Sequence, residues 1–224
     1  MGYRVAAFFD VDNTLIDTKS MFSFLSYLET VWPSRAEAIL EHHQKVLDLA
    51  KHKHITREQV NRYYYRFMNG LNSREVYDFG RRWFESVVSS PGFYIGKVIM
   101  RLRYHQAKGH MVVFVSGSFG ALLEPIAEDL GVEYVLATEL EMNNQVFTGS
   151  LTNIPSIGRG KAVRVIDFAQ RNNIDLDNSY AYGDDASDGP MLALVGNPYL
   201  INPDSITRDL CRYNHKKQFK ELVL

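Results

Sequence analysis

The chain has 224 residues, of which 46% are hydrophobic and 23% are charged, and its formal net charge at pH 7 is −1. This composition is ordinary for a globular protein with one sizeable core, and the small net charge gives no electrostatic reason to expect a nucleic-acid or membrane partner. No run of apolar residues reaches the roughly 18 that a membrane span requires. The single cysteine, Cys211, excludes an intrachain disulfide and a cysteine zinc site, and a reducing cytoplasm is the expected location.

The first predicted element is a buried strand over residues 3–9, because these positions form a short, mostly apolar run. The run ends in Asp10 and Asp12, which are separated by one residue. Residues two apart in a strand point to the same side, so both carboxylates can face one site. Two adjacent carboxylates stay ionised only beside a cation, and otherwise one of them keeps a proton. The pattern therefore fits a divalent-cation site, an acid–base pair, or only the capped end of a strand.

Helical spacing of apolar residues replaces the strand pattern from about residue 20 to residue 90. Thr56 is followed three residues later by Gln59, a capping-box pattern that predicts the start of a helix. Ser73 is the expected N-cap of the last helix in this stretch. We count about four helices and no strand, which indicates a helical domain inserted into another domain. The predicted boundaries are residues 17–90 for the helical domain, and residues 1–16 and 91–224 for the core.

Strands and helices alternate from residue 91 onward. The predicted strands cover residues 111–115, 132–137, 179–182 and 199–201, with helices over 96–107, 119–130, 158–171 and 190–195, and a small hairpin over 140–148. Such alternation produces a parallel sheet with helices on both faces, so the expected fold class is α/β with a doubly wound core. The basic residues near the end are expected on a solvated last helix. They are His215, Lys216, Lys217 and Lys220.

Polar residues follow three of these strands at the point where each strand ends. They are Asp10 and Asp12 after the first strand, Ser116 after the second, and Asp184 and Asp185 after the strand over 179–182. Ligands of open parallel sheets bind outside the carboxyl ends of the strands, so these groups are expected to converge on one edge. Lys161, at the start of a predicted helix, can reach the same edge. This agreement between distant segments indicates one site.

The combination suits hydrolysis of a phosphate ester. Asp10 is the expected nucleophile, and Asp12 would protonate the leaving alkoxide and then deprotonate the water that completes the reaction. Mg²⁺ is the expected cofactor, held by Asp10, Asp184 and the backbone carbonyl of Asp12. Its charge would reduce the repulsion between the phosphoryl group and the attacking carboxylate.

The remaining polar groups of this edge would bind the phosphoryl oxygens. They are the Ser116 hydroxyl, the backbone N–H groups at Val11–Asp12 and Gly117–Ser118, and the charged amine of Lys161. Asp185 and Asp188 are expected behind these groups, where Asp188 would orient Asp184 or Lys161.

These motifs resemble those of the haloacid dehalogenase superfamily of aspartate-nucleophile phosphatases. The matching segments are Asp10-Val11-Asp12-Asn13-Thr14, Val115-Ser116-Gly117, Lys161 within Gly-x-Gly-Lys-Ala, and Gly183-Asp184-Asp185-Ala186-Ser187-Asp188. They occur in the family's order and span most of the chain. The resemblance implies a Rossmann-like core, a helical cap like that of the phosphoserine phosphatase branch, a Mg²⁺ cofactor and an aspartyl phosphate on Asp10.

One position departs from that branch. Phosphoserine phosphatases carry a glutamate nine positions after the nucleophile, where it contacts the amine of the substrate, and this chain has Lys19 there. A lysine repels an ammonium group and favours a neutral or negatively charged one, although Asp17 lies nearby in the sequence. The substrate expected from Lys19 is therefore a small phosphorylated metabolite other than phosphoserine.

The sequence thus predicts a Mg²⁺-dependent phosphomonoesterase that acts on a small phosphorylated metabolite, with neither nucleic acid nor membrane as a partner. Two alternatives remain open. One is a phosphotransferase, in which a second metabolite replaces water, and the other is a protein that binds Mg²⁺ and a phosphorylated ligand without turnover. The pair of Asp10 and Asp12 favours catalysis, because a binding protein has no use for an acid–base pair. The sequence does not distinguish a monomer from a homodimer.

Overall fold

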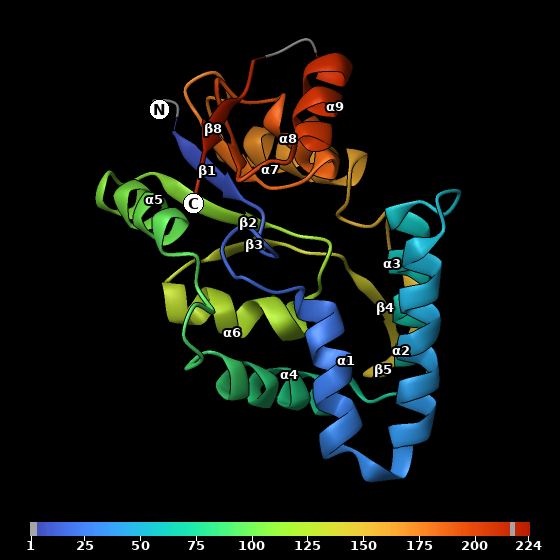
Figure 1. Cartoon of the computed structure of the whole chain (residues 1–224). Coiled ribbons are helices and arrows are strands. Elements are labelled where there is room, and N and C mark those ends of the chain that lie inside the picture. Colours follow the sequence, from blue (N-terminus) through green and yellow to red (C-terminus); the bar gives the residue numbers. More distant parts are fainter. Residues whose placement is uncertain (1–3, 216–217) are drawn as a thin grey trace.

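A six-stranded parallel sheet forms the centre of the structure, a computed structural model that describes residues 4–215 and 218–224 (Figure 1). In spatial order its strands are β3 (Tyr134–Leu136), β2 (Met111–Val115), β1 (Ala6–Phe9), β6 (Tyr180–Gly183), β7 (Asn197–Ile201) and β8 (Lys220–Leu222). Every neighbouring pair in this order is parallel. The prediction of an α/β fold with a doubly wound core is confirmed.

Strand β1 alternates between the two faces of the sheet. Ala7 and Phe9 belong to a hydrophobic cluster that includes residues of α5 (Gly96–Ala107) and α6 (Gly120–Leu130). Ala6 and Phe8 belong to a second cluster on the opposite face. That face is covered by α7 (Arg159–Asn172), α8 (Gly189–Leu192) and α9 (Ser205–His215). Because both faces of β1 are covered, every residue of the strand is apolar.

The segment between β1 and β2 carries α1 (Ser20–Val31), α2 (Ala36–Lys51), α3 (Arg57–Tyr65) and α4 (Ser73–Val87), with 3₁₀ turns at Pro33–Arg35 and Arg66–Met68. Helix α3 begins at the predicted capping box, in which Gln59 N donates to Thr56 Oγ1 at 3.2 Å and Thr56 N donates to Gln59 Oε1 at 2.8 Å. The N-cap of α4 is Asn72 rather than Ser73, because the Asn72 side chain accepts a hydrogen bond from Arg74 N at 3.0 Å.

The predicted hairpin forms an antiparallel pair, β4 (Leu140–Asn143) and β5 (Val146–Leu151), apart from the main sheet. It hydrogen bonds to the loop between α3 and α4. Gly70 N donates to Phe147 O at 2.9 Å, and Phe147 N donates to Leu71 O at 2.9 Å. The hairpin therefore supports the helices that precede β2, although it follows β3 in the sequence.

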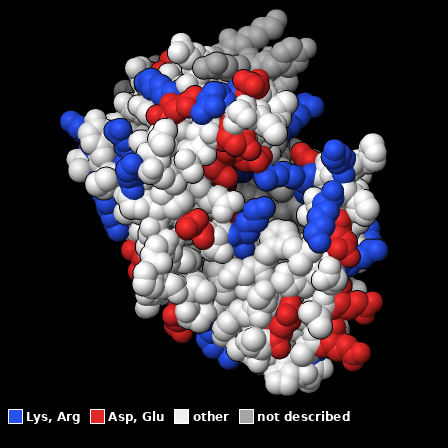
Figure 2. Space-filling view, viewed as in Figure 1, with Lys and Arg blue, Asp and Glu red and all other residues white. Residues whose placement is uncertain are grey.

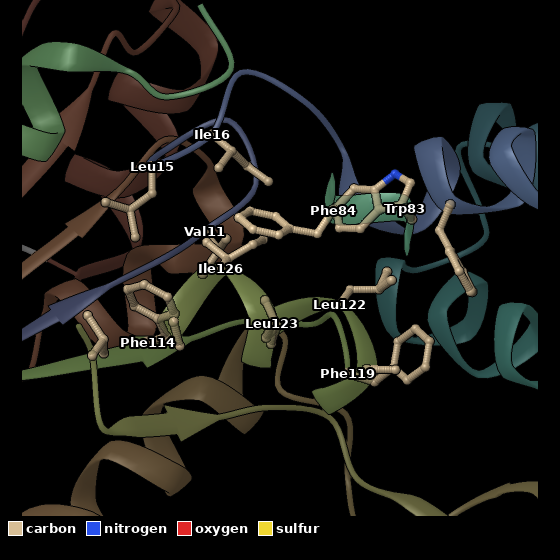
Figure 3. Close-up of a cluster of buried hydrophobic side chains, with 14 of the residues drawn as sticks. Val11, Leu15, Ile16, Trp83, Phe84, Phe114, Phe119, Leu122, Leu123 and Ile126 are labelled. Carbon is tan, nitrogen blue, oxygen red and sulfur yellow. The ribbon is translucent and has the colours of Figure 1, made fainter. Parts of the chain in front are cut away.

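Helices α1 and α4 share a hydrophobic cluster with the sheet (Figure 3). Phe84 of α4 lies near Ile126 of α6 and Val11, whereas Trp83 lies farther along, on the side of Leu122. Helix α4 approaches α6 so closely that a Cβ atom at Gly80 would lie 2.1 Å from the Ala121 carbonyl oxygen. This contact requires glycine, because the obstructing atom belongs to the backbone of α6.

The C-terminal region differs from the expected solvated helix. Helix α9 ends at His215, and Lys220 lies in β8, which pairs in parallel with β7. Lys216 and Lys217 lie outside the described residues. The helix prediction for Lys220 was wrong because a short, charged edge strand has no periodicity that would distinguish it in the sequence. No helix within residues 4–215 and 218–224 is long and apolar enough to cross a membrane.

The contact between α4 and α6 gives a prediction about stability. We expect Gly80→Ala to lower the free energy of unfolding by about 2 kcal/mol, because the added methyl group overlaps a backbone atom that cannot rotate away. The matched control is Gly96→Ala in α5, where a Cβ atom would meet nothing within 4 Å. That substitution should be neutral or slightly stabilising. Urea denaturation of both variants measures the difference, and equal stability of the two would contradict the prediction.

Candidate active site

The site lies at the carboxyl end of β1, where the strand order reverses. Chain order runs from β1 outward to β2 and β3, and the chain then returns to β6 on the other side of β1. Such a switch point leaves a crevice between the loops that follow adjacent strands. The loops after β1, β2 and β6 carry Asp10, Ser116 and Asp184, and all three residues line one cavity of about 230 Å³.

Lys161, near the start of α7, connects two of the carboxylates. It is 3% exposed, and its Nζ lies 2.5 Å from Asp10 Oδ1 and 2.6 Å from Asp188 Oδ1. Burial alone would lower the pKa of Lys161, but the two carboxylates raise it above its usual range, so the amine stays charged. Lys161 thus lies at the edge of the sheet where β1 ends.

Three carboxylates gather around this amine. Oxygen atoms of Asp10, Asp184 and Asp188 all lie within 4.8 Å of one another. Thr14 Oγ1 donates to Asp184 Oδ1 at 3.1 Å. Burial and then repulsion from Asp10 raise the pKa of Asp184 to about 8, and burial raises that of Asp188 to about 6. Oxygen donors with excess negative charge suit a hard divalent cation, so the donor set fits Mg²⁺.

The Asp12 carboxyl stands apart from that cluster. Its Oδ1 atom is buried and has no hydrogen-bond partner among the described residues. Burial, with a contribution from Asp10, raises the pKa of Asp12 to about 7, and hydrogen bonds with Ser20 oppose this shift. A carboxyl group with a pKa near neutrality is suited to give and take a proton.

The loop after β2 is held in a tight turn. Ser116 is 2% exposed, and its Oγ accepts a hydrogen bond from Ser118 N at 3.1 Å. Ser20 Oγ and Ser118 Oγ share a hydrogen bond at 3.0 Å. A Cβ atom at Gly117 would lie 2.6 Å from the Ile157 side chain, so the loop packs closely against the segment before α7.

The other predicted residues occupy different places. Lys19 is exposed and lines the cavity, with its Nζ 5.9 Å from the centre of the Phe22 ring. Val11 is fully buried, and its carbonyl accepts from Leu15 N at 2.8 Å. Asp185 lies outside the carboxylate cluster and pairs with Arg57 NH1 at 3.0 Å.

Sequence reasoning missed the opposite wall of the cavity, which comes mainly from α1, α2 and α3. The apolar part of this wall consists of Met21, Phe22, Val46, Ala50, Val60, Tyr64 and, from the core, Ile157. The missed polar residues are Asn13, Arg57, Asn61 and Ser187. Figure 2 shows acidic side chains at a hollow between the sheet and helices α2 and α3, with basic side chains on its other side. The cavity thus has a charged floor and a largely apolar wall.

The pattern of haloacid dehalogenase-like hydrolases matches residues 7–193, so the chain belongs to this family of hydrolases. The resemblance inferred from the four motifs is confirmed. Among similar proteins, the inhibition of morphological differentiation protein of Streptomyces azureus is 31% identical over 208 residues, which cover 92% of this chain and 74% of that protein. Phosphoserine phosphatase SerB1 of Mycobacterium tuberculosis is 30% identical over 216 residues, which cover 92% of this chain and 68% of that protein.

Solved structures share the fold. A protein of Bordetella pertussis Tohama I superposes with a TM-score of 0.84 at 22% identity, and the match covers 99% of both chains. A substrate-bound phosphoserine phosphatase gives a TM-score of 0.67 at 19% identity and covers 94% of this chain and 91% of that one. The arrangement of sheet and helices is therefore that of the phosphoserine phosphatase-like members of the family.

The buried ion pairs of Lys161 lead to a prediction about stability. We expect Lys161→Met to lower the free energy of unfolding by about 3 kcal/mol at pH 7.5 without Mg²⁺, because it leaves buried carboxylates without their cation. Lys108→Met, the same substitution at an exposed lysine, serves as the control and should have little effect on stability.

The stability of Lys161→Met should depend on pH. The folded-state pKa values of Asp184 and Asp188 lie above the ordinary value of 3.8 even with Lys161 present. At these two carboxyl groups the folded protein therefore binds more protons than the unfolded one between about pH 4 and pH 8, and their contribution to stability falls as the pH rises through this window. Urea denaturation of the variant at pH 5.5 and pH 8 tests this, and a greater stability at pH 8 would contradict it.

Proposed function

We propose that the protein is a Mg²⁺-dependent phosphomonoesterase that hydrolyses a small phosphorylated metabolite through an aspartyl phosphate on Asp10. The observation that carries this proposal is the juxtaposition of a Lys161-bridged carboxylate cluster with the buried, protonatable carboxyl of Asp12. Membership of the hydrolase family supports it, and so does the similarity to a protein named phosphoserine phosphatase.

Asp10, Asp184 and the backbone carbonyl of Asp12 would hold Mg²⁺, and Asp188 completes the carboxylate cluster beside them. When bound, the ion would neutralise part of the charge on the phosphoryl group and on the attacking carboxylate. Lys161 already contributes one positive charge at the same point. The excess of carboxylates over this amine supports the need for a divalent cation.

In the first step, a carboxylate oxygen of Asp10 attacks phosphorus and the bond to the ester oxygen breaks. Asp12 gives its proton to the leaving alkoxide, which departs as an alcohol. In the second step, Asp12 takes a proton from water, and the resulting hydroxide attacks the phosphorus of the aspartyl phosphate. Asp10 is regenerated and phosphate leaves, while the Ser116 hydroxyl and Lys161 hold the phosphoryl oxygens.

The division into a core, residues 1–16 and 91–224, and a helical cap, residues 17–90, belongs to this proposal. The apolar residues that α1, α2 and α3 contribute to the cavity would exclude water from the reacting groups. Lys19, on the same side of the cavity, would favour a leaving group that is neutral or negatively charged over one that carries an ammonium group. This preference separates the proposed substrate from phosphoserine.

The first test is phosphate release from a panel of phosphorylated metabolites, with Mg²⁺ and with EDTA. We expect Mg²⁺-dependent release by the unmodified chain and a loss of about 10³-fold or more in Asp10→Asn, which lacks the nucleophile. Asp17→Asn makes the same change at an exposed aspartate and should stay active. Substantial turnover by Asp10→Asn would refute nucleophilic catalysis by this residue.

The role of Asp12 predicts a dependence on the leaving group. In Asp12→Asn, kcat/KM for propyl phosphate should fall about 10²-fold or more, because the alkoxide leaves without a proton. For p-nitrophenyl phosphate the loss should be much smaller, since p-nitrophenolate is a stable anion. Equal losses for the two esters would show that Asp12 does not protonate the leaving group.

Lys19 predicts a preference between substrates. In Lys19→Glu, the ratio of kcat/KM for phosphoethanolamine to kcat/KM for ethyl phosphate should rise about tenfold, because attraction replaces repulsion of the ammonium group. Lys108→Glu makes the same charge change on an exposed lysine of the core and should leave the ratio unaltered. An unchanged ratio in Lys19→Glu would mean that Lys19 does not contact the substrate.

A further inference from the structure

Three hydrogen-bond donors meet at the backbone carbonyl of Gly117, beside Ser116. Asn61 Nδ2 lies 2.8 Å from this oxygen, Tyr65 Oη lies at 2.9 Å and Thr138 Oγ1 lies at 2.9 Å. Asn61 and Tyr65 are four residues apart on α3, so they approach from one face of that helix. Both are buried, at 4% and 0% exposed. A helix of the segment between β1 and β2 thus binds the loop that follows β2.

The carbonyl of Gly117 and the N–H of Ser118 belong to one planar peptide group. A direction imposed on the carbonyl is therefore imposed on the N–H as well. Ser118 N donates to Ser116 Oγ at 3.1 Å. Because the Ser116 oxygen accepts this bond, its own hydrogen is directed away from Ser118 N and is available to an acceptor in the cavity that Ser116 lines.

The side-chain amide of Asn61 is oriented by the hydrogen bond that its Nδ2 donates to the Gly117 carbonyl. With Nδ2 directed at the Gly117 carbonyl, Asn61 Oδ1 is buried and accepts no hydrogen bond from any residue within 4–215 and 218–224. The reversed amide would bring two acceptor oxygens together at Gly117. An unpaired buried oxygen is unfavourable, so the contact of Nδ2 with Gly117 must outweigh it. Asn61 Nδ2 also lies 3.6 Å from Met21 Sδ, but sulfur is a weak acceptor, so the bond to the Gly117 carbonyl is the stronger of the two.

We propose that Asn61 and Tyr65 are positioning residues that act through the Gly117 carbonyl to direct the Ser116 hydroxyl at the phosphoryl group of the substrate. The inference rests on the proposed phosphatase function and extends it, because it makes the phosphate-binding hydroxyl dependent on α3. Without the contacts of α3, the peptide group would lose two of its three donors and Ser116 would lose its fixed orientation.

A double-mutant cycle with Ser116→Ala tests this dependence. With Ser116 present, we expect Tyr65→Phe and Asn61→Leu each to lower kcat/KM for p-nitrophenyl phosphate with Mg²⁺ by about 5- to 20-fold, the loss typical of one hydrogen bond. With Ser116→Ala, the same changes should cost less than about 2-fold, because there is no hydroxyl left to orient. Equal losses in both backgrounds would overturn the proposal and indicate a purely structural role.

Tyr64→Phe is the matched control. Tyr64 is the neighbouring buried tyrosine of α3, and its hydroxyl donates to Met21 O at 3.0 Å rather than to Gly117. Tyr64→Phe should change kcat/KM by the same factor in the unmodified chain and in Ser116→Ala. Tyr65→Phe removes only one oxygen atom, so it carries the test by itself if Asn61→Leu does not fold. Thermal denaturation of each variant identifies such a failure.

Binding of inorganic phosphate separates failure of this inference from failure of the proposed function. The affinity for phosphate, measured by calorimetry with Mg²⁺, should weaken in Tyr65→Phe when Ser116 is present and stay unchanged when it is absent. Additive losses in both turnover and binding would overturn the positioning role while leaving the phosphatase intact. Absence of turnover in the unmodified chain would overturn the proposed function, and the binding cycle would still decide whether Tyr65 acts through Ser116.

Discussion

The ion pairs of Lys161 with Asp10 and Asp188 join segments that are far apart in the chain at one buried point. Removing these charges from water is costly, and the cost is recovered only because opposite charges lie within hydrogen-bond distance. The negative charge is still not fully neutralised, since Asp184 adds a third carboxylate within 4.8 Å of the other two. Protons or a bound cation must supply the missing positive charge. The same excess of negative charge that suits a metal ion therefore destabilises the fold when no ion is bound.

The position of this charge follows from the topology of the sheet. Strand β1 is central, with β2 on one side and β6 on the other, and both of its faces are covered. Its apolar residues fix it in the core, so the first polar residue after the strand, Asp10, emerges at a defined point. Asp10 N donates to Tyr182 O at 2.9 Å, which continues the pairing of β1 with β6 to the edge of the site. Strand pairing thus fixes the backbone position of Asp10.

Local sequence patterns were sufficient to predict the polar residues at the ends of the strands, but they were insufficient to predict the side of the cavity that α3 forms. Asp10, Ser116 and Asp184 each follow an apolar run, and the rule for parallel sheets brings such strand ends together. Arg57, Val60, Asn61 and Tyr64 have the spacing of one helical face, but spacing alone does not indicate what that face contacts. The polar partners of Asn61 and Arg57 come from the loops after β2 and β6, so only the folded chain reveals them. The hairpin β4–β5 was predicted for the same local reasons as the strands, whereas its contact with residues 70–73 depends on tertiary structure.

The helices between β1 and β2 contact the core in two different ways. Helix α4 packs against α6 through apolar side chains and through Gly80, a contact that water cannot replace without exposing the cluster. Helix α3 contacts the loops of the site through polar groups, including Asn61 and Tyr65 at Gly117 and Arg57 at Asp185 and Ser187. Tyr65 is also fully buried, and its ring packs against that of Phe119, with 5.4 Å between the ring centres. Helix α4 therefore holds the segment against α6 mainly by apolar packing, whereas α3 combines buried aromatic packing with hydrogen bonds to the loops of the site. Because α3 both lines the cavity and supplies two of the three donors to the Gly117 carbonyl, the shape of the cavity wall and the orientation of the Ser116 loop depend on the same helix.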